Sequence, residues 1–172
     1  GVQPPYWPDG KVPCTTDPSG WCDSPGHPGF DCDDYARAWA AWLRSQLESL
    51  YPDAEYFVLY VYYGNPPQGH AVVLILIDGK YYIVDPQTGL VLGPIDEGTW
   101  LNPTDFAPWL RDLLRDHYGQ PDPGKITWKR HPPDYIDPND VKPWYDDPDV
   151  REWFRQQFPG LNPHDFIWSS GS

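Results

Sequence analysis

One tight turn constrains the fold of this chain more than any other feature. Asp78 and Gly79 separate two runs that are rich in β-branched and aromatic residues, 70–77 and 80–85. Asp-Gly between two such runs is the strongest short signal for a two-residue β-hairpin. A two-residue turn pairs the last residue of the first run with the first residue of the second, so it sets the register of both strands.

That register brings two chemically important side chains together. It places Asp85 opposite Val72, and residues two apart on a strand point to the same face. His70 and Asp85 therefore emerge on one face as diagonal neighbours, about 7–8 Å apart at the backbone. The sequence thus predicts an imidazole beside a carboxylate at the open end of the hairpin. A three-residue loop or a bulge would separate them.

A helix is predicted just before these strands. Apolar residues recur at spacings of three and four over residues 31–50, Asp31 is in position to cap the helix, and Pro52 ends it. Cys32 lies in the first turn on the same face as Ala36 and Ala40, so its thiol is expected to point towards the sheet.

The helix start bears on the reactivity of this thiol. Free backbone N–H groups and the positive end of the helix dipole favour the thiolate, which is the nucleophilic form. Asp31, Asp33 and Asp34 flank Cys32, and their negative charges favour the protonated thiol. We therefore expect Cys32 to need a cationic partner such as an imidazolium.

The remaining segments carry weaker signals. Residues 56–63 are almost all aromatic or β-branched and predict a central strand covered on both faces. Val91-Leu92 predicts a short further strand. Helices are expected over 102–116 and 147–158, an irregular Pro/Asp-rich wrap over 119–149, and an irregular wrap over 1–30.

The order of cysteine, histidine and aspartate resembles a known family. DCDDYA at 31–36, GHAVV at 69–73 and DPQTG at 85–89 resemble the transglutaminase-like branch of the papain-like fold, in its cysteine peptidases and deamidases. The resemblance covers about residues 30–93. It implies an α+β fold in which an N-terminal helix packs on a small antiparallel sheet. We expect a single domain, 1–172, in which 1–30 wraps a 31–93 core and 94–172 forms a helical, Pro/Asp-rich extension.

The resemblance also implies a chemistry. Cys32 would be the nucleophile, His70 the base and Asp85 the orienting carboxylate of a hydrolase or acyl transferase that acts on amide bonds of peptides or proteins without a cofactor. Gln68 or Trp21 would assist the Cys32 backbone N–H as an oxyanion donor. The alternative is a non-catalytic structural or interaction protein that retains the fold, such as a secreted or virion component.

The three cysteines allow two readings. Cys14 and Cys22 can pair as a disulfide that pins the N-terminal segment, which would leave Cys32 free and suit a secreted or extracytoplasmic protein. Cys14, Cys22, His27 and Cys32 can instead form a Cys3His zinc set. We favour the disulfide and expect no metal, because the first spacing is too long for a zinc knuckle.

Composition excludes several classes of partner. The formal net charge is -13, so the chain would repel nucleic-acid phosphates and anionic membranes. No apolar run approaches the ~20 residues of a membrane-spanning helix. The chain has 23 Pro and 15 Gly, but also 10 Trp, 12 Tyr and 6 Phe, and such aromatic content is typical of a folded chain. The sequence makes no prediction of the assembly state.

Two further groups have an ordinary and a functional reading. Two aspartate groups could hold Ca²⁺ but more simply form Asp-Pro turns: Asp134, Asp137, Asn139 and Asp140, and Asp146, Asp147 and Asp149. Several tryptophans could bind sugars or another chain but more simply pin loops onto the core: Trp100, Trp109, Trp128, Trp144, Trp153 and Trp168.

Overall fold

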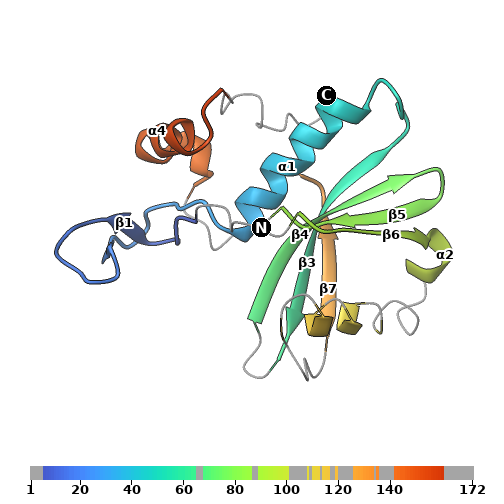
Figure 1. Cartoon of the computed structure of the whole chain (residues 1–172), viewed down its shortest axis with the longest axis horizontal. Helices are drawn as coiled ribbons and strands as arrows, with labels where there is room; N and C mark the ends of the chain where they lie inside the picture. The colour runs from blue at the N-terminus through green and yellow to red at the C-terminus, as the bar shows by residue number, and fades with distance from the viewer. Residues whose placement is uncertain are drawn as a thin grey trace.

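The protein combines one central helix with antiparallel β-structure (Figure 1). The structure is a computed structural model that describes residues 6–64, 68–86, 89–100, 126–133 and 142–160, with positions 108, 110–112, 114–116, 119 and 135. The central helix, α1, spans Cys32–Leu47. It lies between the large sheet on one side and the second long helix, α4 (Pro148–Gln157), on the other.

The large sheet has five strands in the order β6-β5-β4-β3-β7, and all neighbouring pairs are antiparallel. Its strands are β3 (Glu55–Tyr63), β4 (Gln68–Ile77), β5 (Lys80–Val84), β6 (Val91–Asp96) and β7 (Thr127–His131). The expected central strand over 56–63 is confirmed, because β3 lies between β4 and β7 and is buried along most of its length.

The predicted hairpin register is confirmed. Ile77 pairs with Lys80, and the same register continues to the pairing of Val73 with Val84. Asp78 has φ 51° and Gly79 has φ 74°. Two successive residues with positive φ suit a tight hairpin turn, whose twist matches that of the flanking strands.

Each face of the sheet carries its own apolar cluster, because side chains alternate along the strands. Ala71, Val73 and Ile75 of β4 pack with Ala36 and Ala40 of α1. On the opposite face, Val72 and Leu74 pack with residues that include Leu110, Leu114 and Ile126. Within the expected helix 102–116, positions 108, 110–112 and 114–116 are described and are helical.

A third, aromatic cluster holds the N-terminal segment and α4 against the outer face of α1. It is formed by buried residues from three parts of the chain: Trp7, Phe30, Tyr35, Ala38, Trp144, Val150 and Phe154. Trp144, in a short 3-10 helix at Trp144–Asp146, is 2% exposed. Trp144 thus pins its segment to the core, as the simpler reading of the tryptophans predicts, whereas Trp109, Trp168 and the side chain of Trp100 lie outside the described residues.

Two expectations about irregular segments are wrong. The N-terminal wrap contains a small hairpin of β1 (Lys11–Pro13) and β2 (Trp21–Asp23), whose strands are too short for a visible alternation. β7 lies in the expected wrap 119–149, where its Lys129 and Arg130 suit an exposed edge strand. The expected strand at Val91-Leu92 is confirmed as the start of β6, which extends through Pro94 to Asp96; the proline is tolerated because β6 is the other edge of the sheet.

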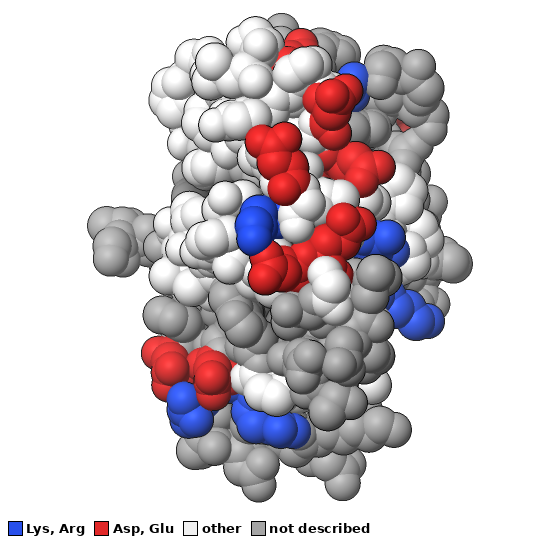
Figure 2. All heavy atoms as spheres, turned by 90° about the vertical axis from the view of Figure 1, so that its right-hand side faces the viewer, with Lys and Arg blue, Asp and Glu red and all other residues white. Residues whose placement is uncertain are grey.

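The acidic character of the chain is visible on its surface. Figure 2 shows the end of the molecule that carries β6 and the short helix α2 (Glu97–Trp100), with acidic side chains gathered in a band across it. Few basic side chains interrupt this band. A polyanion that approaches this face would therefore be repelled by the protein's own negative charges.

The turn can be tested with a pair of glycine variants. Gly79→Ala places a side chain at positive φ, so we expect it to lower the free energy of unfolding by about 1 kcal/mol. Gly98→Ala is the matched control, because Gly98 lies in a helix with nothing within 4 Å of an added Cβ. Urea unfolding measures both, and equal stability of the two variants would contradict this turn geometry.

Candidate functional site

Cys32 begins α1 and packs against the sheet. The helix start is held by the Asp31 backbone N–H, which donates to Asp34 Oδ2 at 3.0 Å. The Cys32 side chain is half-buried against the cluster that contains Ala36 and Ala71. The backbone N–H groups of Ala71 and Asp33 both donate towards its sulfur. The thiol therefore lies beside β4, next to the backbone of the residue that follows His70.

The surroundings of this thiol favour its protonated form. Burial, followed by the charge of Asp33, raises the pKa of Cys32 to about 12. The N–H groups of Ala71 and Asp33 act in the opposite direction but are outweighed. The helix N-terminus by itself therefore does not produce a thiolate at neutral pH, and removing the proton requires a base.

The carboxyl groups around Cys32 are themselves perturbed. Burial, and then the charge of Asp33, raises the pKa of Asp34 well above its usual range. Burial and a hydrogen bond with Asp33 raise the pKa of Asp31. Both shifts favour the protonated carboxyl groups and so reduce the negative charge at the helix start. Asp33 is also contacted by the Tyr60 hydroxyl, at 3.5 Å from Asp33 Oδ2.

His70 and Asp85 meet where the hairpin register predicts. His70 Nε2 lies 3.5 Å from Asp85 Oδ2, and the two side chains are 11% and 2% exposed. Asp85 directly follows β5 and is fixed by its backbone, since its N–H donates to the Leu90 carbonyl at 2.9 Å and its carbonyl accepts from the Gly89 N–H at 2.8 Å. This turn positions the carboxylate against the imidazole.

The thiol and the His70–Asp85 pair are associated with the same end of β4. Strand alternation assigns His70 to the face of Val72 and Leu74, whereas Ala71 faces α1. The Ala71 N–H nevertheless donates towards the Cys32 sulfur, so the sulfur lies along the same stretch of backbone. Contact between ring and thiol therefore requires the imidazole to turn around the edge of β4 from the face of Val72 towards that of Ala71, at a point beyond the last pair that β4 forms with β5, Val73 and Val84.

The two expected oxyanion donors lie in different surroundings. Gln68 is exposed at the start of β4, two residues before His70. Trp21 packs in the aromatic cluster, with its ring 5.7 Å from that of Trp7. Of the two, Gln68 is the one on the strand that carries His70.

Two tyrosines near the thiol were not predicted from the sequence. Burial, and then the charge of Cys32, raises the pKa of Tyr63. Burial, followed by the charges of Asp31 and Cys32, raises that of Tyr6. Both phenols are therefore protonated hydrogen-bond donors in the neighbourhood of the sulfur. No spacing rule in the sequence links either residue to Cys32.

An apolar cavity of about 160 Å³ lies between α1 and α4, lined by residues that include Trp42 and Phe154. Its α1 residues belong to a different face of the helix from Cys32, which packs against the sheet. The cavity is therefore separate from the thiol.

The expected disulfide is present, with Cys14 and Cys22 sulfurs 2.02 Å apart. All three cysteines lie among the described residues, so Cys32 is left as the free thiol. The alternative Cys3His zinc set is therefore wrong, because two of its sulfurs are bonded to each other. A disulfide is consistent with an extracellular location, and the described helices include none long and apolar enough to cross a membrane.

Residues 31–111 match the family model of a transglutaminase-like domain. The match includes Cys32, His70 and Asp85, and it confirms the resemblance inferred from the sequence while extending it beyond β6. No curated protein and no solved structure matches the chain.

The electrostatic account of the thiol predicts the effect of Asp33→Asn. Removing this negative charge lowers the pKa of Cys32, so the rate of alkylation by iodoacetamide at about pH 8 should rise several-fold. Asp53→Asn, which removes an equal charge from an exposed turn, should leave the rate unchanged. Identical pH profiles for Asp33→Asn and the unaltered protein would contradict the assigned cause.

Proposed function

We propose that this protein is a thiol-dependent hydrolase or acyl transferase that acts on amide bonds of peptides or proteins. In this proposal Cys32 is the nucleophile, His70 the general base and Asp85 the orienting carboxylate of a papain-like core. The observation that carries the proposal is the close approach of His70 Nε2 and Asp85 Oδ2, at 3.5 Å and nearly shielded from solvent. The match to a transglutaminase-like domain supports protein substrates.

The raised thiol pKa decides how the first step proceeds. Since Cys32 is protonated at neutral pH, sulfur attack on the amide carbonyl carbon and loss of the thiol proton must be coupled. With Nε2 directed at Asp85, Nδ1 of His70 is the nitrogen that receives this proton. Asp85 stabilises the resulting imidazolium and fixes the ring orientation.

The rest of the cycle returns each group to its starting state. The tetrahedral intermediate collapses when the C–N bond breaks, and the leaving amine takes the proton from His70. A thioester then links the acyl group to Cys32. Water or a second amine attacks this thioester, its proton passes to His70, and the C–S bond breaks to release an acid or a new amide. His70 finally returns the proton to the sulfur.

The oxyanion that forms on the carbonyl needs hydrogen-bond donors. The Cys32 backbone N–H is available for this role, because the first N–H groups of a helix have no partner within the helix. We propose Gln68 as the second donor, because it lies two residues before His70 on β4. Tyr63 is a further candidate, since its phenol stays protonated and its pKa is influenced by the Cys32 charge.

A second function is favoured by one observation. A thiol whose pKa is about 12 is a weak nucleophile unless a base assists it. The non-catalytic alternative is a structural or interaction protein that keeps the fold, as expected of a secreted component. It predicts an unreactive Cys32 and differs from the enzyme in the experiment below.

Acylation by an activated ester tests the enzyme without knowledge of its substrate. We expect p-nitrophenyl acetate to acylate Cys32, as located by mass spectrometry, and the reaction to vanish in Cys32→Ser. His70→Ala should slow it by ~10²–10⁴-fold through loss of the general base. Asp85→Asn should slow it by at least about tenfold, because the ring loses its orientation.

The control and a second readout complete this test. Asp96→Asn removes a charge from the exposed β6 residue that pairs with Lys80 and should react at the original rate. Transfer or hydrolysis is then assigned with glutamine peptides by the product, since transfer incorporates the added amine and hydrolysis converts the glutamine to glutamate. Acylation that is absent, or equally fast in His70→Ala, would favour the non-catalytic protein.

A further inference from the structure

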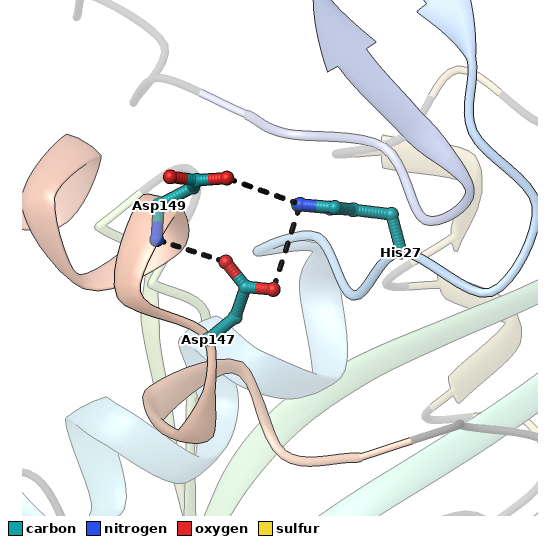
Figure 3. A group of neighbouring side chains, drawn as sticks. All are labelled: His27, Asp147 and Asp149. Atoms are coloured by element: carbon teal, nitrogen blue, oxygen red, sulfur yellow. Dashed lines mark hydrogen bonds and ion pairs between the residues drawn. The ribbon is translucent and has the colours of Figure 1, made fainter.

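A histidine and two aspartates meet where the N-terminal segment contacts the start of α4 (Figure 3). His27 follows the β1–β2 hairpin, Asp147 is the N-cap of α4, and Asp149 lies in its first turn. His27 Nε2 is 3.5 Å from Asp147 Oδ2 and 4.0 Å from Asp149 Oδ2. Both carboxylates turn towards the same ring nitrogen. The sequence grouped Asp147 and Asp149 with Asp146, but the structure brings His27 to them instead.

The His27 ring is fixed by contacts that do not involve these carboxylates. Its Nδ1 lies 2.7 Å from the Pro28 carbonyl oxygen, and because a carbonyl only accepts, Nδ1 carries the proton of this bond. The ring also stacks on Trp7, with centroids 5.3 Å apart and planes 4° from parallel. With Nδ1 committed in this way, Nε2 is the ring nitrogen that faces the two carboxylates, and in a neutral ring it would present its lone pair to them.

This arrangement favours a cation between the ring nitrogen and the two carboxylates. Nε2 is shielded from solvent and has no hydrogen-bond donor directed at it, while Asp147 is only 7% exposed. A lone pair and two carboxylate oxygens repel one another unless a positive charge lies among them. A proton on Nε2 is one solution, but 3.5 Å to Asp147 Oδ2 is long for a charge-assisted hydrogen bond, which is typically about 2.7–2.9 Å.

We propose that His27 Nε2, Asp147 Oδ2 and Asp149 Oδ2 bind a divalent transition-metal ion, with Zn²⁺ as the best match. Tetrahedral zinc with bonds of about 2.0–2.1 Å separates its ligand atoms by about 3.3 Å, and the ligand atoms here all lie within 4.8 Å of one another. Small side-chain movements would close the site, with water as the fourth ligand. An imidazole ligand disfavours Ca²⁺ and Mg²⁺, which prefer oxygen.

The surrounding bonds resemble those that support metal sites. The Nδ1–H bond to the Pro28 carbonyl orients the imidazole in the way that metal-bound histidines are usually held. Asp147 keeps Oδ1 for the α4 cap, accepting from the Asp149 and Val150 N–H groups at 2.9 and 3.2 Å. Its Oδ2 is thus free of the cap bonds and directed at His27. A bound ion would clamp the segment that precedes Cys32 to α4.

Lys142 is the cation that the chain itself supplies here. Its Nζ lies 3.4 Å from Asp147 Oδ2, and its side chain is 41% exposed. Lys142 and a metal ion would therefore compete for this oxygen. Removing the ammonium group with Lys142→Gln should leave metal affinity unchanged or increase it.

Metal titration of the full chain tests the proposal. We use chelator-treated protein with Cys32→Ser, so that the free thiol contributes no metal ligand, and titrate ZnCl2 by isothermal calorimetry. We expect one equivalent to bind and to raise the melting temperature. Asp149→Asn should weaken binding at least tenfold, and because Asp149 is 82% exposed this variant should fold normally. His27→Gln should weaken binding as strongly.

Matched variants and a spectroscopic readout make the result decisive. Asp146→Asn removes the same charge from an exposed neighbouring position and should bind zinc as the parent does. Co²⁺ in the same protein should give a visible absorption band that is lost in His27→Gln. Absence of zinc binding, or equal binding by the parent and by Asp149→Asn, would overturn the proposal and leave Lys142 and a protonated His27 as the cations of this cluster.

Discussion

The pairing of β4 with β5 is the interaction on which the candidate site depends. The turn at Asp78 and Gly79 sets the register, and a slip of one residue would transfer a whole strand's side chains to the other face. His70 and Asp85 would then lie on opposite faces of the hairpin. Burial opposes such a slip. Apolar side chains of β4 and β5 pack into a cluster on each face of the sheet, and a slip of β5 would remove its side chains from these clusters.

The start of α1 illustrates how burial changes the expected chemistry of a helix terminus. The dipole and the N–H groups favour a thiolate, but desolvation and Asp33 raise the pKa of Cys32 to about 12. The same desolvation raises the pKa of Asp31 and of Asp34 and so favours their protonated forms. The proposed reaction makes the His70–Asp85 pair responsible for removing the thiol proton.

Local signals predicted the parts of this structure that short sequence patterns control. Three such patterns each lie within one short stretch of consecutive residues: the Asp-Gly turn, the apolar stripe of α1 and the β-branched run of β3. The spacing of Cys14 and Cys22 indicated the disulfide. β7 was missed because its five residues include Lys129 and Arg130 and have no apolar alternation. The contact of His27 with Asp147 joins segments 120 positions apart, which no local pattern encodes.

The site itself was predicted in part. The hairpin register brought His70 to Asp85 because parity follows directly from turn length. The surroundings of Cys32 could not be predicted in this way, because the roles of Ala71, Tyr6 and Tyr63 depend on how α1 lies on the sheet. The raised thiol pKa likewise reflects burial, and the balance between burial and the helix dipole is decided by packing.

The central claim is that His70 serves as the base for the Cys32 thiol. The most direct test is the pH dependence of Cys32 alkylation by iodoacetamide in the unaltered protein and in His70→Ala. Assistance by His70 predicts an increase in rate over the range in which imidazoles lose their proton, and this increase should be absent from His70→Ala. Superimposable profiles, both rising only as the thiol itself ionises at high pH, would contradict the account.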